Sequence, residues 1–296
     1  MFAGSLVALV TPMSAGGEVD FEAWARLLDF HAAHGTQGVV VGGTTGESAT
    51  LRDAELRELV VRACAQLRGR LVVIAGAGSS STARTVERVA WLSELPLDAL
   101  LVVTPAYNRP SPEGLYLHFA AAAAAARKPL LLYNVPARTA VDMKPPTVAR
   151  LAQLPGIAGI KEAVPEEARV RELLACCPRQ FVVLSGDDAS ARASVAAGAR
   201  GVISVTANVA PRAMSEMVAA AVRGAAARAA QLDAGLRELH QALFLEANPI
   251  PVKWLLAQMG LIGPGVRLPL TPLGEEHRAA VLHAARAVGA LPREAP

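Results

Sequence analysis

Short aliphatic runs alternate with longer segments of helical periodicity along most of the chain. None of the runs alternates apolar with polar residues, which is typical of parallel strands whose two faces are both covered. The pattern predicts eight buried strands, at Leu6–Val10, Gly38–Val41, Leu71–Ala75, Ala99–Val103, Leu130–Tyr133, Ile157–Lys161, Phe181–Ser185 and Gly201–Ser204.

The segments between these runs carry the start and stop signals of helices. Asp20 is placed to cap a helix that extends to about His34, and Gly35 is placed to end it. Thr50 is predicted to cap the following helix, and Ser81 the helix after that. A strand followed by a helix is therefore the repeating unit.

Eight strand–helix units within about 220 residues predict the α/β class and a (β/α)8 TIM barrel over residues 1–224. The same alternation also permits an open, doubly wound sheet. Beyond Gly224 the strand pattern stops. Residues 225–296 are predicted to form a C-terminal helical region, interrupted at Pro249–Pro251 and at Gly263–Pro264.

The composition narrows the classes of protein to consider. Hydrophobic residues make up 52% of the 296 residues, but only 6 are Phe, 3 Trp and 3 Tyr, which excludes a nucleic-acid binder that stacks bases on exposed rings. The 29 basic and 26 acidic residues give a net charge of +3 and form no long runs, so no nucleic-acid or membrane-binding patch is expected.

Targeting, disulfide and metal signals are weak. No run approaches the ~18 apolar residues of a membrane span, and Met1–Val10 lacks the pattern of a secretory signal. The three cysteines make no disulfide framework, and the six histidines lack acidic or thiol neighbours at metal-ligand spacing. We therefore expect a cytoplasmic protein without a metal ion, an organic cofactor, nucleic acid or a membrane as partner.

Two glycine-rich segments follow predicted strands, at the end of a barrel where active sites form. In Gly42–Glu47, three glycines allow backbone N–H groups to converge, and Thr44 and Thr45 add hydroxyls, which together suit a carboxylate or phosphate. An ordinary tight turn is the alternative. The segment Gly76–Gly78 faintly resembles a dinucleotide-binding fingerprint, but Ser81 replaces its third glycine and no acidic residue follows at the required distance.

Lys161 stands at the end of a predicted buried strand, where desolvation penalises a charged side chain. Alternation places it on the same face as Gly159, which we expect to leave space below the amine. A neutral amine held in a pocket can attack a carbonyl and form a Schiff base. Alternatively, Lys161 extends to solvent along its aliphatic stem or pairs with Glu162.

Two phenols and an arginine follow neighbouring strands at the same end. Tyr133 ends the fifth predicted strand and Tyr107 follows the fourth, so both could shuttle protons if neighbouring hydroxyls polarise them. Arg138, in the loop after Tyr133, has the forked donors that clamp a carboxylate. Each has an ordinary alternative as a packing Tyr or a surface Arg, but their joint placement favours a site.

Several of these segments resemble the pyruvate-dependent Schiff-base aldolases of the N-acetylneuraminate lyase superfamily and, within it, the dihydrodipicolinate synthase family. The resemblance rests first on Gly42–Glu47, Tyr133–Thr139 and Gly159–Glu162. It extends over nearly the whole chain through further matching stretches at Leu6–Pro12, Ser185–Asp188, Gly201–Asn208, Asn248–Lys253 and Arg267–Pro272.

The resemblance implies that pyruvate condenses with L-aspartate 4-semialdehyde to give 4-hydroxy-tetrahydrodipicolinate, in lysine and diaminopimelate biosynthesis and without a cofactor. Lys161 would form the Schiff base with pyruvate, and the backbone and hydroxyls around Thr44 and Thr45 would hold its carboxylate. Tyr133, Thr44 and Tyr107 would relay protons, with Tyr107 reaching into the site of a neighbouring subunit.

The resemblance also implies roles for three further residues. Ile203 would line the pyruvate pocket through its main chain, Gly186 would belong to the substrate-binding residues, and Arg138 would bind the carboxylate of the semialdehyde. Arg138 favours this reaction over that of the sialic-acid lyases, which usually lack the arginine. The implied assembly is a homotetramer, built as a dimer of dimers.

Some positions depart from lysine-inhibited members of the family. Leu56 and Arg84 stand where a His and a Glu are typical, Ser80 where an Asn is, and Ala106 where an aromatic residue is. Because Arg84 should repel the ammonium of a bound lysine, we expect weak or no inhibition by L-lysine. The departures leave open a related aldolase acting on N-acetylneuraminate or a 4-hydroxy-2-oxo acid. An NAD-dependent oxidoreductase would need a complete dinucleotide-binding fingerprint, which the segment at Gly76–Gly78 lacks. A non-catalytic binding module would leave the buried Lys161 unexplained.

Overall fold

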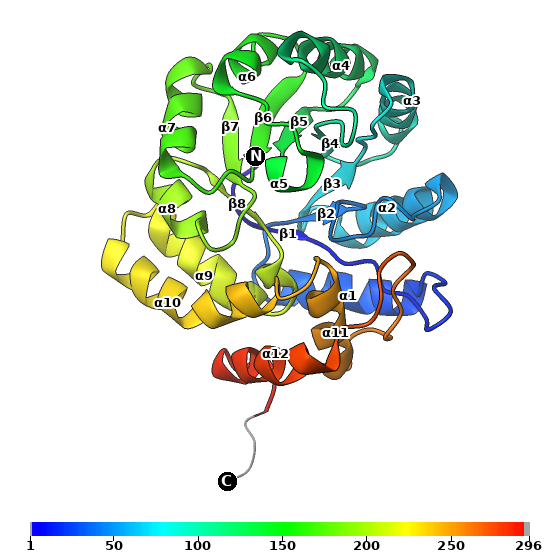
Figure 1. Ribbon diagram of the computed structural model, residues 1–296, viewed down its shortest axis with the longest axis vertical. Helices are drawn as coiled ribbons and strands as arrows, with labels where there is room; N and C mark the ends of the chain where they lie inside the picture. The colour runs from blue at the N-terminus through cyan, green and yellow to red at the C-terminus, as the bar shows by residue number, and fades with distance from the viewer. Residues whose placement is uncertain (1, 293–296) are drawn as a thin grey trace.

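The computed structural model describes residues 2–292, within which eight parallel strands close into a barrel (Figure 1). Each strand pairs with the next along the chain, and the last strand pairs with the first, so the predicted TIM barrel is confirmed and the open sheet is excluded. The strands are β1 (Gly4–Ala8), β2 (Gly38–Val41), β3 (Val72–Gly76), β4 (Ala99–Val103), β5 (Leu130–Asn134), β6 (Ile157–Glu162), β7 (Val182–Ser185) and β8 (Gly201–Ser204).

Helices alternate with the strands and surround the barrel, and further helices follow the last strand, as predicted. Those around the barrel are α1 (Phe21–Ala33), α2 (Asp53–Leu67), α3 (Thr82–Leu92), α4 (Pro112–Ala125), α5 (Pro136–Thr139), α6 (Pro145–Leu151), α7 (Glu167–Cys176), α8 (Ala191–Ala196), the 3-10 helix η1 (Thr206–Asn208) and α9 (Pro211–Val222). The C-terminal helices are α10 (Ala226–Ala242), α11 (Ile250–Gln258) and α12 (Glu275–Ala287).

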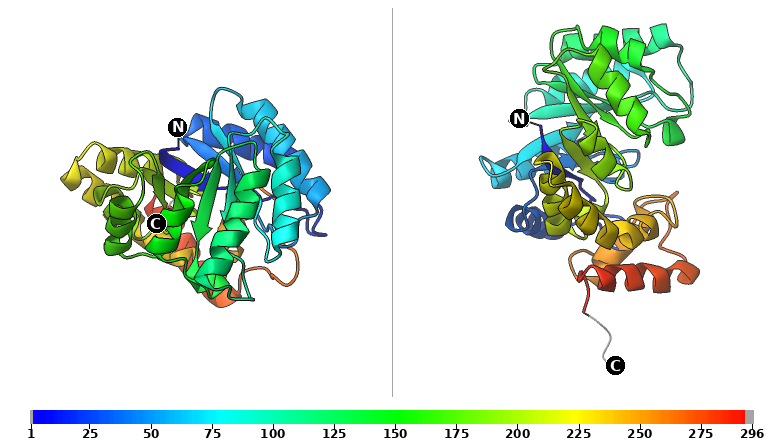
Figure 2. Two further views of the ribbon diagram at one scale, coloured as in Figure 1. Left: turned by 90° about the horizontal axis from the view of Figure 1, so that it is seen from above. Right: turned by 90° about the vertical axis from the view of Figure 1, so that its left-hand side faces the viewer.

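The C-terminal helices pack directly on the barrel helices. Helix α10 contacts α9 and α8, and α12 contacts α10 and α11. In Figure 1 and in the right-hand view of Figure 2, α11 and α12 lie at one side of the barrel, beyond α1. The division of the chain at Gly224 into two regions stays a prediction.

Two of the three predicted helix caps are confirmed. The Asp20 carboxylate accepts two backbone N–H groups of the first turn of α1, at 3.0 and 2.9 Å, and the Ser81 hydroxyl caps α3. Thr50 does not cap α2, because its hydroxyl donates to the carbonyl oxygen of Glu47 at 3.2 Å. That helix begins later, where the Arg52 N–H donates to the Glu55 carboxylate at 2.8 Å.

The first strand begins two residues earlier than predicted. It spans Gly4–Ala8 rather than Leu6–Val10, because its pairing with β8 starts at its first residue. The Val10 N–H instead donates to Oδ1 of Asn208 in η1, at 3.1 Å. The aliphatic run therefore continues past the end of its strand, and the hydrophobic pattern does not mark where the pairing stops.

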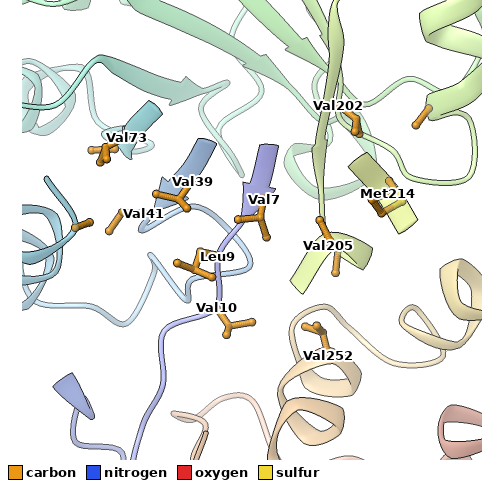
Figure 3. Close-up of a cluster of buried hydrophobic side chains, with 14 of the residues drawn as sticks. Val7, Leu9, Val10, Val39, Val41, Val73, Val202, Val205, Met214 and Val252 are labelled. Atoms are coloured by element: carbon orange, nitrogen blue, oxygen red, sulfur yellow. The ribbon is translucent and has the colours of Figure 1, made fainter. Parts of the chain in front are cut away.

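Two apolar layers build the core, one inside the barrel and one between the strands and the helices. Alternation separates them: Val40 of β2 faces the interior, whereas Val39 and Val41 face the helices. Figure 3 shows part of the outer layer, with side chains from β1, β2, β3, β8 and α11. The strand residues of the inner layer include Leu6, Ala8, Val40, Ile74, Leu101, Leu131, Tyr133, Leu184 and Ile203.

Candidate active site

Lys161 and Tyr133 lie side by side at one end of the barrel interior. The pairing of β5 with β6 sets Tyr133 opposite Lys161, so both side chains leave the sheet on the same face. The Lys161 Nζ lies 4.3 Å from the centroid of the Tyr133 ring, and both residues are buried. The structure thus brings the predicted nucleophile and the predicted phenol together.

Neither alternative for Lys161 agrees with its surroundings. The residue is 5% exposed, so it does not extend to solvent. Glu162 instead accepts hydrogen bonds from Asn134 at 3.0 Å and from Arg169 at 3.3 Å. Among residues 2–292, no carboxylate lies within ion-pair distance of Lys161. A buried amine without a counter-charge is suited to attack a carbonyl.

A charged network lies next to the lysine, at the end of β6. Arg169 binds the Asp142 carboxylate at 2.8 Å and also contacts Glu162. The guanidinium of Arg169 holds the pKa of Asp142 well below its usual range. Burial raises the pKa of Glu162 to about 7, although hydrogen bonds from the Val164 N–H and from Asn134 oppose that shift.

Gly186 provides space along the Lys161 side chain. A Cβ at Gly186 would lie 3.0 Å from the Lys161 Cε and 3.1 Å from its Cγ, closer than ordinary contact. Gly159 was expected to leave this space, but a Cβ there would meet the carbonyl oxygen of Val182 at 2.3 Å. Gly159 therefore permits close pairing of β6 with β7, and the room for the lysine lies at Gly186.

The loop after β2 presents two adjacent N–H groups without a protein acceptor. Hydrogen bonds from Gly46 to the Gly43 carbonyl (3.0 Å) and from Glu47 to the Thr44 carbonyl (3.1 Å) close the turn. Across the part of the chain that the structure describes, the N–H groups of Thr44 and Thr45 donate to no oxygen. Such a pair suits a carboxylate, which favours an anion site over an ordinary turn.

Asn248, from the segment before α11, contacts two predicted site residues. Its Nδ2 donates to the Thr45 Oγ1 at 3.0 Å, and its backbone carbonyl accepts from the Arg138 Nη2 at 2.9 Å. Asn248 was not predicted from the sequence as a site residue. The signal that could have found it is the interruption of the C-terminal helices at Pro249–Pro251.

A buried ion pair holds the same loop against α11. Lys253 of α11 pairs with Glu47, and both side chains are almost fully buried. The other Glu47 oxygen accepts the Arg267 N–H at 3.0 Å, and the Arg267 guanidinium binds Glu55 at 2.6 Å. Burial lowers the pKa of Lys253, while the Glu47 carboxylate opposes that shift. The C-terminal region therefore fixes the end of the loop that carries Thr44 and Thr45.

A cavity of about 500 Å³ lies between the loops at this end of the barrel. Leu56, one of the departing positions, does not line it, because that side chain is buried against Gly42. The cavity joins the predicted carboxylate sites to the other departing positions, and its lining includes Thr44, Ser48, Ala49, Ser80, Arg84, Ala106, Arg138 and Thr139.

Tyr107 points away from this chain. It is 95% exposed and has a φ of 74°, a left-handed conformation that non-glycine residues rarely adopt. Glu47 and Ala140, in loops at the same end, also have positive φ, and such strain gathers at functional sites. Within residues 2–292, no hydrogen bond links Tyr133, Thr44 and Tyr107, so the proton relay stays a prediction.

Ile203 of β8 is buried in the inner layer of the barrel. The backbone just beyond it is fixed by Asp188, whose Oδ2 accepts the N–H groups of Val205 and Thr206 at 2.8 and 2.9 Å. A main-chain role of Ile203 toward a ligand stays a prediction, although its position at this end of the barrel suits that role.

The glycines of the weak dinucleotide fingerprint serve packing. A Cβ at Gly76 would lie 2.1 Å from the carbonyl oxygen of Gly42, and one at Gly78 would lie 2.7 Å from the backbone nitrogen of Val103.

Among residues 2–292, no three or more His, Cys, Asp or Glu side chains lie close enough together to hold a metal ion. In the same residues, no helix is long and apolar enough to cross a membrane.

The known proteins that are similar to this chain all point to one family. The model of the dihydrodipicolinate synthetase family matches residues 1–288. The 4-hydroxy-tetrahydrodipicolinate synthases of Ectopseudomonas mendocina and Pseudomonas aeruginosa are 52% and 50% identical, each over 98% of this chain and 100% of the relative. A pyruvate complex of the chloride-inhibited dihydrodipicolinate synthase from Acinetobacter baumannii superimposes with a TM-score of 0.96 at 44% identity, covering 98% of this chain and 100% of the other.

Proposed function

Because the chain belongs to the dihydrodipicolinate synthetase family, we infer that it condenses pyruvate with L-aspartate 4-semialdehyde to give 4-hydroxy-tetrahydrodipicolinate. This is the lyase reaction EC 4.3.3.7 of lysine and diaminopimelate biosynthesis. The observation that carries the proposal is Lys161, a buried amine without a counter-charge that faces Tyr133. Barrel enzymes place such residues at the carboxyl ends of their strands.

The first half of the reaction forms the nucleophile. The Lys161 amine attacks C2 of pyruvate, and loss of water gives the Schiff base. The N–H groups of Thr44 and Thr45 hold the pyruvate carboxylate, and Tyr133 transfers the protons. Removal of a proton from C3 then leaves an enamine, whose C3 is the attacking carbon.

The second half forms the ring and frees the lysine. The enamine C3 attacks the aldehyde carbon of the semialdehyde, whose oxygen takes a proton and stays as the hydroxyl group. The amine of this substrate then attacks the Schiff-base carbon and displaces Lys161, so one water is released overall. Arg138, which lines the cavity, binds the semialdehyde carboxylate. Gly186 leaves space beside the Lys161 side chain, and the main chain of Ile203 lines the pyruvate pocket.

A comparison of substrates tests this function. The purified protein, given pyruvate and L-aspartate 4-semialdehyde, should consume both and form the cyclic product, and it should not cleave N-acetylneuraminate or a 4-hydroxy-2-oxo acid at a comparable rate. Arg138→Ala should raise KM for the semialdehyde about tenfold or more, because a bidentate carboxylate contact is lost. Preferential cleavage of one of the two other substrates would assign the protein to a related aldolase reaction.

The homotetramer, a dimer of dimers, is also part of the proposal, with Tyr107 acting in the site of a neighbouring subunit. Its support is the almost complete exposure of a strained phenol beside the cavity. Co-expression of a Lys161→Ala subunit with a Tyr107→Phe subunit tests the exchange. Mixed dimers would contain one intact site, so activity should return to about a quarter of the wild-type value. No recovery would show that Tyr107 does not cross between subunits.

A cytoplasmic location belongs to the same proposal. The thiols of Cys64, Cys176 and Cys177 are free, which suits a reducing compartment. Fractionation of cells that express the tagged chain should recover it with cytoplasmic marker enzymes, and recovery with periplasmic or membrane markers would contradict this part of the proposal.

A further inference from the structure

The Thr45 hydroxyl has one partner in the protein, and that partner is a donor. Asn248 donates from Nδ2 to the Thr45 Oγ1 at 3.0 Å, in a region where Thr45 is 2% and Asn248 6% exposed. A hydroxyl can accept one hydrogen bond and donate another at the same time, whereas an amide nitrogen only donates. Among residues 2–292, no oxygen or nitrogen accepts the Thr45 hydroxyl proton.

We propose that Asn248 is a positioning residue for pyruvate. Its side-chain amide donates a hydrogen bond to the Thr45 hydroxyl oxygen, so the hydroxyl proton is left to point toward the pyruvate carboxylate. This inference rests on the proposed pyruvate site. It adds a third donor to the two N–H groups of Thr44 and Thr45. The direction matters because a carboxylate only accepts, so a hydroxyl turned the other way would present its lone pairs to a negative charge.

The remaining atom of the amide supports a role beyond packing. The Asn248 Oδ1 is buried and has no hydrogen-bond partner among the described residues. Buried amides in a purely structural role normally satisfy both ends, as Asn208 does by bonding the Val10 N–H and the Ala8 carbonyl. Asn248 leaves one end unsatisfied while its donor is directed at Thr45, which is the arrangement expected of a side chain placed for a ligand.

Asn248 contacts the two proposed carboxylate sites through different atoms. Its side chain reaches Thr45 on the pyruvate side, whereas its backbone carbonyl holds Arg138 on the semialdehyde side. A side-chain substitution removes the first contact and keeps the second. The effect of such a substitution should therefore fall on one substrate only, which a general loss of structure would not produce.

The test is steady-state kinetics of Asn248→Ala with each substrate varied in turn. We expect KM for pyruvate to rise about tenfold, the loss of one hydrogen bond to a charged group, with KM for the semialdehyde and kcat within about twofold. Asn248→Asp, which keeps the shape of the side chain, should raise KM for pyruvate further, because its carboxylate accepts the Thr45 proton and repels the substrate. This second variant carries the test if Asn248→Ala does not fold.

A double substitution tests whether Asn248 acts on pyruvate binding through the Thr45 hydroxyl. In a Thr45→Val background, adding Asn248→Ala should raise KM for pyruvate no further, because Asn248 acts through the hydroxyl. Asn208→Ala is the matched control: it removes another buried amide and should lower Tm without a selective change in KM for pyruvate. Additive effects at Thr45 and Asn248, or equal increases in both KM values, would overturn the inference.

The outcome also separates this inference from the proposed function. If borohydride traps no pyruvate on Lys161 of the wild-type protein, the Schiff-base function itself is wrong. If the adduct forms on Lys161 but Asn248→Ala keeps the wild-type KM for pyruvate, only the role of Asn248 is wrong.

Discussion

Two buried lysines, Lys161 and Lys253, lie in different regions of this protein and differ in one respect. They are 5% and 2% exposed, so both amines are buried. Lys253, where α11 meets the loop after β2, pairs with the Glu47 carboxylate. Lys161, inside the barrel, faces the Tyr133 ring and has no carboxylate partner among the described residues. Both lysines are buried, but only Lys253 has a carboxylate partner. The missing counter-charge distinguishes Lys161, the reactive lysine, from Lys253, the structural one.

The surroundings of each lysine explain the difference. Glu47 is held on its other oxygen by the Arg267 N–H, so Lys253 completes a network that joins the C-terminal region to the barrel. The Lys161 side chain instead runs past Gly186, a residue without a side chain of its own. A lysine with space and without an anion can accept a covalent partner, whereas a lysine locked to a carboxylate cannot leave it without a large penalty.

The largest predicted effect separates the two lysines by activity. Lys161→Ala should lower kcat at least about a thousandfold, because no other amine in the site can form the Schiff base. Its Tm should equal or exceed that of the wild type, since no ion pair is lost. Initial rates and calorimetry of the same preparation measure both. Full turnover by this variant would show that the counter-charge comparison does not identify the nucleophile.

The opposite result is predicted for the other lysine. Lys253→Ala should lower the free energy of unfolding by about 3–5 kcal/mol, because the buried Glu47 carboxylate loses its partner. Denaturant unfolding measures this loss. The double variant Lys253→Met with Glu47→Gln removes both charges and should recover part of it. A stable Lys253→Ala protein, with wild-type denaturation, would mean that the ion pair does not fix the loop.

The buried carboxyl of Glu162, next to Lys161, should make the stability of the protein depend on pH. Burial raises the pKa of Glu162 from 4.5 to about 7, so the folded protein holds a proton that the unfolded chain releases between these values. Its contribution to stability is therefore full below pH 4.5 and is lost as the pH rises through 7. Glu162→Gln should be about 1–3 kcal/mol more stable than the wild type at pH 8, with little difference at pH 4.5.

Urea unfolding at several pH values checks this prediction. The exposed Glu172, on the same α7 that supplies Arg169, provides the control, and Glu172→Gln should follow the wild-type pH dependence. A Glu162→Gln protein with an unchanged pH dependence would show that Glu162 ionises normally in the folded state.

The smallest predicted effect concerns an exposed cation, in contrast with the two buried ones. Arg84 lines the cavity together with Ser48 and Ser80, and we expect its positive charge to repel the ammonium of an L-lysine molecule that enters there. Low-millimolar L-lysine should therefore change initial rates by less than about a fifth. Arg84→Glu should increase the sensitivity, because attraction replaces repulsion. Strong inhibition of the wild-type enzyme would contradict this account of the cavity.

The architecture could be predicted from the sequence because its signals are local. Each strand is an apolar run, and Asp20 and Ser81 cap their helices through residues only two or three positions away. The same locality places Tyr133 and Lys161 at adjacent strand ends, where parallel pairing brings them together. Short-range patterns were therefore sufficient for the barrel and for the centre of the site.

The remaining features depend on contacts between distant segments. Asn248 meets Thr45 across 203 positions, and Lys253 meets Glu47 across 206, so neither pair leaves a periodic signal. Thr50 was a reasonable cap by residue type, but its hydroxyl is used by the loop of Glu47. The packing of the C-terminal region on the barrel determines these partners, and a local sequence pattern does not record that packing.

Trapping of the intermediate shows which lysine forms the Schiff base with pyruvate. The protein is incubated with pyruvate, reduced with borohydride, digested and examined by peptide mass spectrometry. We expect one reduced pyruvate adduct on the peptide that contains Lys161, and an unmodified Lys253. An unmodified Lys161 under these conditions, or an adduct on Lys253 instead, would contradict this expectation.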